Sequence, residues 1–254
     1  MSATTSPADR RTPLVRAILA QAGMELRLLV RSGESLLVTF GIPLGLLVFF
    51  SSVDVLPTGD RSSVEFLVPG VLAISTAATG LVAVAIQTAF ERKYGVLKRL
   101  GGTPLPRSGF LAAKGIAVAA LLLVQTALTL ALALGPLGWR PTTGIGVAIA
   151  IVLVGAVAHT ALGLLLAGTL RAEATLALSN ALFLVLLVIS GVSFDASVLP
   201  DGLATVGRML PLGALAEALR AALEGGSATG PLLVVVGWGA AAAAVAARTF
   251  RWEP

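Results

Sequence analysis

The sequence predicts an all-α, polytopic membrane protein with six transmembrane helices, and two observations carry that prediction. Hydrophobic residues make up 56% of the 254 residues and charged residues only 12%, about half their share in an ordinary soluble domain. Several apolar runs also reach the roughly 20 residues that a helix needs to cross a hydrocarbon core about 30 Å thick. These runs fill most of the chain, so we expect one transmembrane domain at residues 12–254 after a disordered tail at residues 1–11.

Residues 12–32 are predicted to form an amphipathic helix at the membrane surface. At about 100° per residue, one stripe of this helix is apolar and consists of Leu14, Val15, Ile18, Leu19, Ala22, Leu26 and Leu29. Arg16, Arg27 and Arg31 fall on the opposite side, where they would meet anionic lipid headgroups. The alternative, a surface helix of a soluble protein, is disfavoured by the apolar span that follows.

The six predicted spans cover residues 35–52, 66–89, 114–134, 144–170, 174–194 and 231–247. Lys114, at the start of the third span, is expected to extend its ammonium group toward the cytoplasmic surface. Residues 195–230 are moderately polar and are interrupted by Pro200 and Pro211. Two helical patterns within them are too short to span, and the second has an apolar stripe made of Ala214, Leu215, Ala218, Leu219, Ala222 and Leu223. A re-entrant or interfacial helical hairpin is therefore predicted between spans five and six, on the outer side.

The distribution of basic residues predicts the orientation of the chain. Six spans place both termini on one side, together with the loop at residues 90–109 and the short loop near Arg171. That side carries 14 of the 18 Lys and Arg residues, and loops on the cytoplasmic side of membrane proteins are enriched in these residues. We therefore expect a multi-pass protein with cytoplasmic N- and C-termini.

The loop at residues 90–109 is the most basic segment between two spans. Phe90, Tyr94 and Leu97 are spaced so that a helix continuing from the second span would have one apolar edge beside a basic one. A glycine pair at residues 101–102 would end that helix, and two prolines after it would stiffen the chain. The product would be a short, rigid projection that a soluble partner can bind. The alternative is that these basic residues only hold the loop in the cytoplasm.

Several kinds of chemistry are absent from the sequence. There is no G-x-x-x-x-G-K-S/T motif to hold a nucleotide, and there is no cysteine. We therefore expect no catalytic, cofactor-binding or metal-binding residue on this chain, which is predicted not to be an enzyme. Any ATP and Mg²⁺ would be bound by a partner. The sequence also shows no interleaving of basic and aromatic residues, so no nucleic-acid partner is expected.

Polar residues inside the spans are candidates for a substrate pathway, and they are Gln87, His159 and Asn180. His159 is the single histidine, which is too few for a metal site. A hydrogen-bonded packing role is the simpler interpretation, because buried polar groups usually find partners. An intramembrane enzyme or an ion-coupled carrier centred on His159 is the alternative.

The loop sequence over Glu91–Leu100, followed by Thr103–Arg107, resembles the loop signature of one family. This family is the type-two ABC transporter permeases, and within it the daunorubicin-exporter-like membrane subunits. Weaker matches follow the same order along the chain: Pro69-Gly70, Asn180, Ser190-Gly191-Val192, Leu199-Pro200, Pro211-Leu212 and Glu217-Ala218-Leu219-Arg220. The resemblance extends from Arg16 to the C-terminus.

The resemblance implies an exporter permease of a bacterial cytoplasmic membrane, working as a dimer with two copies of a separate ATPase. Residues of the loop would couple the permease to the ATPase: Glu91, Arg92, Gly95, Leu97, Lys98, Thr103, Pro104 and Arg107. The cargo would be a hydrophobic or amphipathic compound such as a drug, an antibiotic, a lipid or a lipid-linked glycan. A membrane anchor that recruits an ATPase without transport is a further alternative.

Overall fold

The computed structural model describes residues 14–31, 37–53, 62–100, 102–103, 105–141, 143–192 and 200–251. Every regular element in these ranges is a helix, which confirms the all-α prediction. The predicted tail at residues 1–11 lies outside the described residues. The helices are α1 (Leu14–Val30), α3 (Ile42–Ser52), α4 (Ser63–Ala77), α5 (Val84–Lys93), α6 (Val96–Leu100), α7 (Arg107–Leu134), α8 (Ile145–Thr169), α9 (Ala172–Ile189), α10 (Asp201–Met209), α11 (Pro211–Glu224) and α12 (Thr229–Thr249), with π-helical turns η2 (Leu37–Gly41) and η3 (Ala78–Ala83).

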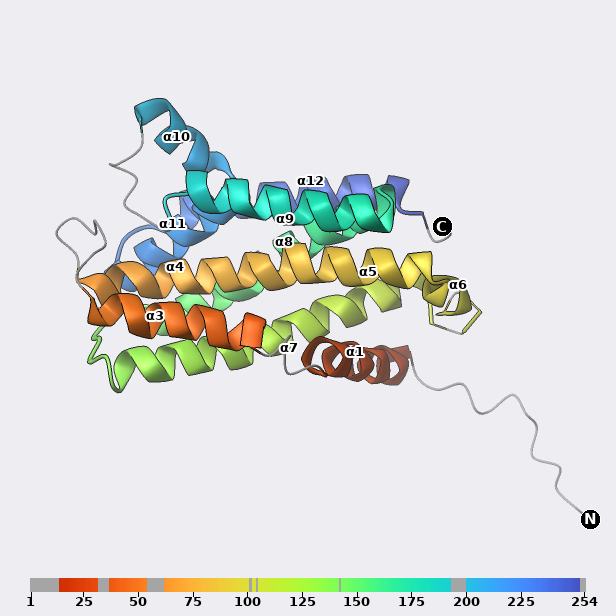
Figure 1. The fold of residues 1–254 in the computed structure, drawn as a ribbon, viewed down its shortest axis with the longest axis horizontal. Helices are drawn as coiled ribbons and strands as arrows, with labels where there is room; N and C mark the ends of the chain where they lie inside the picture. Colours follow the sequence, from red (N-terminus) through yellow and green to blue (C-terminus); the bar gives the residue numbers. More distant parts are fainter. Residues whose placement is uncertain are drawn as a thin grey trace, which may run out of the picture.

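The long helices run side by side along the length of the bundle (Figure 1). We call the end that carries α6 the α6 end; α1 packs on α7 there, and α12 finishes there. We call the opposite end the α11 end, where α11 packs against α4, α8 and α12 and where α10 projects from the bundle. The charged loop and the predicted outer hairpin therefore lie at opposite ends of the molecule.

One continuous helix, Ser63–Lys93, runs through the middle of the bundle. It starts with a capping box, in which the Ser62 hydroxyl accepts from the Glu65 backbone N–H and the Glu65 carboxylate accepts from the Ser62 N–H. At about 1.5 Å per residue, its 31 residues extend over about 46 Å, which exceeds a hydrocarbon core of about 30 Å. The charged end of the helix can therefore reach beyond the membrane.

Five helices among the described residues are long and apolar enough to cross a membrane: Ser63–Lys93, Arg107–Leu134, Ile145–Thr169, Ala172–Ile189 and Thr229–Thr249. They correspond to the last five predicted spans. The first predicted span, residues 35–52, contains only the shorter apolar helix Thr39–Ser52 in the described ranges. A multi-pass membrane protein is thus supported, and the first span, which would bring the number to six, stays a prediction.

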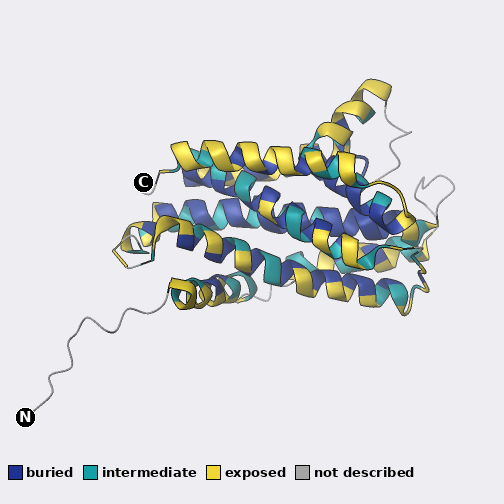
Figure 2. Cartoon of the chain, turned by 180° about the vertical axis from the view of Figure 1, so that it is seen from behind, coloured by how far each residue is buried: buried dark blue, intermediate teal, exposed yellow. Residues whose placement is uncertain are grey.

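The buried core gathers on the middle helices, and the outer helices expose apolar side chains (Figure 2). In the central helix Ser63–Lys93, 78% of the most apolar window is buried, compared with 22% in α9 and in α12. Small residues let α8 approach the centre: a Cβ on Gly163 would lie 2.6 Å from the Gly80 carbonyl oxygen. Large apolar side chains exposed on α9 and α12 suit contact with lipid.

The two amphipathic segments bury different amounts of their apolar stripes. In α1, Ala22 is buried against the bundle, whereas Leu14 and Leu19 are more than half exposed. In α11, the whole predicted stripe is buried: Ala214, Leu215, Ala218, Leu219, Ala222 and Leu223. The two predicted hairpin helices are present as α10 and α11. Because α11 packs on α4, α8 and α12 as well as on its hairpin partner α10, it belongs to the protein core. The membrane positions of α1 and the hairpin stay predictions.

Candidate functional site

A buried polar cluster connects α1, α5 and α7 at the α6 end. It consists of Gln21 and Glu25 from α1, Gln87 and Glu91 from α5, and Lys114 from α7. The side chains of Glu25 and Lys114 are each only 3% exposed. Three helices that are distant in sequence therefore meet through charged groups that are largely removed from water.

The Lys114 ammonium group is the centre of this cluster. Its Nζ lies 2.7 Å from Glu25 Oε2 and 2.8 Å from Glu91 Oε2, so one cation bridges two carboxylates. The Gln87 amide donates to Glu25 Oε2 at 2.9 Å and to Glu91 Oε1 at 2.8 Å. Gln21 donates to the other oxygen of Glu25 at 2.8 Å. These bonds offset the large cost of burying charge, and removing one partner would leave that cost uncompensated.

Sequence reasoning missed Glu25 and misplaced Lys114. The expected extension of Lys114 to the cytoplasmic surface is wrong, because the ammonium group finds two carboxylates inside the protein. Glu25 is the one acidic residue of α1, and it falls in the apolar stripe, three residues after Ala22 and seven after Ile18. An acid on an apolar stripe was the available signal, since a buried carboxylate needs a basic partner.

The end of α5 is also bonded to the junction between α8 and α9. The Arg92 guanidinium donates to the Leu170 carbonyl, and Lys93 forms an ion pair with Glu173. The backbone N–H of Arg251, just after α12, donates to the Gly168 carbonyl at 3.0 Å. Carbonyls at a helix C-terminus have no partner within the helix and favour positive charge, so the contacts of Arg92 and Arg251 cap α8. The ion pair of Lys93 instead joins α5 to the first turn of α9.

The predicted single helix through Leu97 is wrong, because the chain turns at Tyr94 and Gly95 before α6 begins. Gly95 has a φ of +72°, a backbone conformation that side chains disfavour, and its N–H bonds to the Arg92 carbonyl. The turn separates Tyr94, which is 66% exposed, from Leu97, which is fully buried. Leu97 holds α6 on the bundle, and the Thr103 hydroxyl donates to the Leu100 carbonyl at the end of α6, at 2.6 Å.

Exposed side chains around this turn form what we call the α6 surface: Tyr94, Val96, Lys98, Arg99 and Thr103. Lys93 Nζ lies 5.6 Å from the centre of the Phe90 ring and 5.9 Å from that of Tyr94, which adds cation–π contacts at its base. The α6 surface is thus a basic and partly aromatic patch. It lies on and beside the short helix α6, whose Leu97 side chain is buried in the protein.

A comparison with protein-family models gives the family. The model described as ABC-2 type transporter matches residues 17–223, from α1 to α11. The chain belongs to the ABC-2 type transporter family. No curated protein in the comparison matches the chain. ABC-2 permeases are membrane components of ABC-type transporters, are not themselves catalytic, and normally pair with an ATPase subunit. The narrower resemblance to daunorubicin exporters stays a prediction.

In this ABC-2 permease, the residues predicted to couple to an ATPase divide into two groups. Glu91, Arg92 and Leu97 face into the protein, where they bond or pack to other helices. Lys98, Thr103 and Arg107 are exposed, while Gly95 forms the turn and Pro104 lies outside the described residues. The inner group can hold the shape of the loop, and the exposed group lies on the surface of the protein.

The predicted pathway residues have three different surroundings. Gln87 belongs to the buried polar cluster. His159 is fully buried where α8 meets Gly80 of η3; its Nδ1 lies 2.9 Å from the Gly155 carbonyl, and its Nε2 has no partner among the described residues. Asn180 is exposed on α9 and donates to the Leu176 carbonyl at 2.8 Å. These residues do not form one site.

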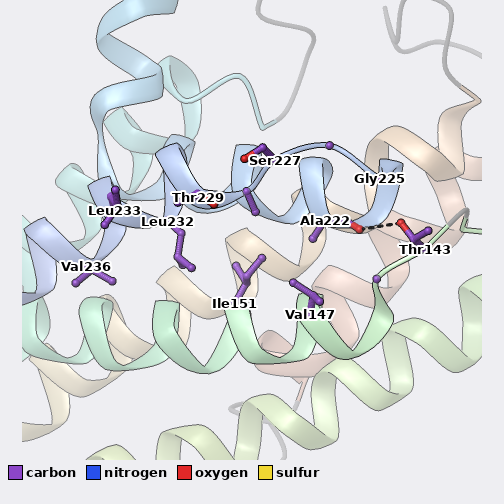
Figure 3. A pocket seen from close by; sticks show the side chains of 13 residues that line it. Thr143, Val147, Ile151, Ala222, Gly225, Ser227, Thr229, Leu232, Leu233 and Val236 are labelled. Atoms are coloured by element: carbon purple, nitrogen blue, oxygen red, sulfur yellow. Dashed lines mark hydrogen bonds between the residues drawn. The ribbon is translucent and has the colours of Figure 1, made fainter.

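A cavity of about 660 Å³ lies between α8, the end of α11 and α12 (Figure 3). Val147, Ile151, Leu232 and Val236 give it an apolar wall, and no charged residue lines it in the described structure. At its edge the Thr143 hydroxyl donates to the Ala222 carbonyl at 3.5 Å. Such a wall suits an apolar molecule. The described ranges also contain no group of three acidic or histidine side chains that could hold a metal ion.

Proposed function

We propose that this ABC-2 permease is the membrane subunit of an ATP-driven exporter and that the α6 surface binds its separate ATPase. One observation carries the proposal. The α6 surface is basic and exposed, and the chain that supports it is joined to α1 and α7 by the buried polar cluster and to α8 and α9 by Arg92 and Lys93. A partner that pushes on α6 would therefore move several spans together.

The mechanism needs a second permease and two ATPase subunits. ATP and Mg²⁺ would bind to the ATPase subunits, whose closure would push the two α6 surfaces toward each other. The displacement would pass through Glu91 and Lys114 to α1 and α7, and through Arg92 to the start of α9. Such rigid movements of packed helices are a common way to open a cavity to alternate sides. We propose a homodimer of permeases as the functional unit.

The positions of the basic residues support an orientation in the membrane, and the apolar cavity walls support a class of cargo. Twelve basic residues of the described chain lie at the α6 end, on or beside α1, α5, α6, the start of α7, the start of α9 and the end of α12: Arg16, Arg27, Arg31, Arg92, Lys93, Lys98, Arg99, Arg107, Lys114, Arg171, Arg248 and Arg251. This supports a cytoplasmic α6 end. The resemblance to exporter permeases adds the proposal of six spans in a bacterial cytoplasmic membrane. Apolar walls support a hydrophobic or amphipathic cargo, such as a drug in multidrug efflux, an antibiotic, a lipid or a lipid-linked glycan.

The test reverses the charge of the α6 surface. The double variant Lys98→Glu and Arg99→Glu should abolish binding to the cognate ATPase, the stimulation of its ATP hydrolysis by the permease, and export of a lipophilic dye. The matched control is Arg208→Glu on α10, an exposed basic residue at the opposite end, which should retain all three. Unchanged association and transport in the double variant would overturn the docking proposal.

A second candidate function is a carrier or an intramembrane enzyme centred on His159. The observation behind it is that His159 Nε2 has no hydrogen-bond partner among the described residues. Such a protein would act in proteoliposomes without an ATPase and would lose that activity in His159→Ala. We expect no activity without the ATPase, because His159 is enclosed by α8 and η3. ATPase binding without any export would instead favour a membrane anchor.

A further inference from the structure

A second groove lies on the outside of the bundle, between α7, α8 and α12. Its volume is about 660 Å³, and much of its wall consists of small residues, including Ala112, Gly115 and Ala119 on α7. Val157 and Ile116 also line it and are 67% and 41% exposed, so the groove opens toward the surroundings of the bundle. For a membrane-spanning bundle those surroundings are lipid chains.

The mouth of the groove, at the α6 end, is positively charged. Arg107 and Ser108 line it, and they form the first turn of α7, a helix of 28 residues. No side chain caps this helix start, and the first intrahelical bond is that from the Phe110 N–H to the Pro106 carbonyl. The N–H groups of a helix's first turn and the helix dipole favour an anion at such a start. No acidic residue lines the described groove.

Thr160 is an independent sign that the groove takes a ligand with polar atoms. It lines the wall of the groove, is 4% exposed, and its hydroxyl has no partner among the described residues. Thr76 and Thr129, on neighbouring spans, instead donate to the carbonyl four residues earlier. A buried hydroxyl without a partner is costly, and an ester oxygen in the groove would satisfy it.

We propose that this groove binds one anionic phospholipid from the leaflet at the α6 end. Its phosphate lies at Arg107 and the first turn of α7, and one acyl chain lies along the small residues of α7 and α12. Charge complementarity selects an anionic headgroup over a zwitterionic one. Both lipids carry a phosphate, but the choline cation of the zwitterionic lipid is repelled by Arg107 and by the positive end of the α7 dipole. The apolar wall selects a lipid chain over a soluble anion. This inference does not depend on ATP-driven export.

The experiment measures lipid binding to the purified, delipidated full-length chain. Native mass spectrometry would compare one added equivalent of phosphatidylglycerol with one of phosphatidylcholine. We expect phosphatidylglycerol to bind about tenfold more tightly, and Arg107→Gln to remove most of that preference. Gly115→Leu should block both lipids, because a Cβ at Gly115 has no atom within 4 Å and the longer side chain would occupy the groove without a clash.

Gly146→Leu is the matched control, since Gly146 on α8 has equally open space and does not line the groove. Lipid binding by this variant should equal that of the wild type. The proposal would be overturned if the wild type bound both lipids equally. It would also be overturned if Gly115→Leu bound lipid as well as the wild type does. So would disulfide-linked dimers of Ile116→Cys in membranes, because the chain has no other cysteine and the link would place a second copy in the groove.

Discussion

The two ends of the bundle are held together by different physical means. At the α6 end, charged side chains make the contacts: Lys114 bridges two carboxylates, and Arg92 bonds to the end of α8. At the α11 end, backbones touch where side chains are missing, and a Cβ on Gly144 or Gly207 would lie 2.0 Å from a backbone atom of another helix. The α6 end is therefore sensitive to lost charge, and the α11 end to added volume.

This difference suits the coupling to an ATPase proposed for the α6 end. Ionic contacts have definite lengths and directions, so they can pass a push from one helix to the next. Glycine contacts let helix surfaces lie close without interlocking side chains, which eases small sliding movements. Charged side chains also make contacts at the α11 end. Arg220 donates to the Gly191 carbonyl at 2.7 Å and lies over the Phe66 ring, and Arg208 Nε lies 3.7 Å from Glu217 Oε2.

The largest expected effect is loss of the central charge at the α6 end. Lys114→Met would leave Glu25 and Glu91 buried without their cation, which should cost about 3–5 kcal/mol in the free energy of unfolding. Thermal unfolding in nanodiscs would measure it. Lys98→Met is the control, since Lys98 is exposed.

A triple variant separates charge from packing at the same site. Adding Glu25→Gln and Glu91→Gln to Lys114→Met removes all three charges and should recover most of the lost stability, as paired buried charges can often be replaced together. If Lys114→Met unfolds like the wild type, the cluster is not the ionic contact that distinguishes the α6 end.

The next effect tests the α11 end by adding one methyl group. Gly144 has a φ of +84°, and its Cβ would meet the Ala222 carbonyl oxygen, so Gly144→Ala should destabilise the protein by about 3 kcal/mol. Gly146→Ala, two residues along, meets nothing and should be neutral or stabilising. Equal melting temperatures for the two variants would show that this end tolerates added volume.

The smallest effect concerns the exposed ion pair between Lys93 and Glu173. Lys93→Glu should leave the melting temperature unchanged and raise hydrogen exchange at the junction of α8 and α9. Glu173→Lys in the same chain should restore protection by exchanging the two charges. Both changes should fade at high salt, since exposed pairs are screened. A response that ignores salt would show that charge is not the cause.

Much of the helical framework could be predicted because membrane helices must be long and apolar. The bounds differ most where local chemistry acts: the central helix continues to Lys93, and Gly95 then turns the chain, although the spacing of Tyr94 and Leu97 suggested one helix. The stripe of α11 was correctly identified. A stripe cannot distinguish burial against protein from burial against lipid, so the position of α11 in the core could not be foreseen.

The candidate site was less predictable, because its central contacts join residues far apart in sequence. Glu25 and Lys114 are 89 residues apart, and no periodicity within a helix connects them. The loop motif indicated Glu91 and Arg92 as coupling residues. Whether their side chains point into the protein or toward a partner depends on how α5 packs against α7 and α8. A single sequence carries no signal for that packing.

The π-helical turn η3 sets the rotation of everything that follows it in the central helix. An α-helix turns by about 100° per residue, and a π-helical turn takes one more residue into a single turn. With residues 78–83 in α-helical form, Gln87 and Glu91 would be rotated by about that angle, away from Glu25 and Lys114. The extra residue in η3 therefore rotates α5 relative to α4, so that the polar side of α5 faces α1.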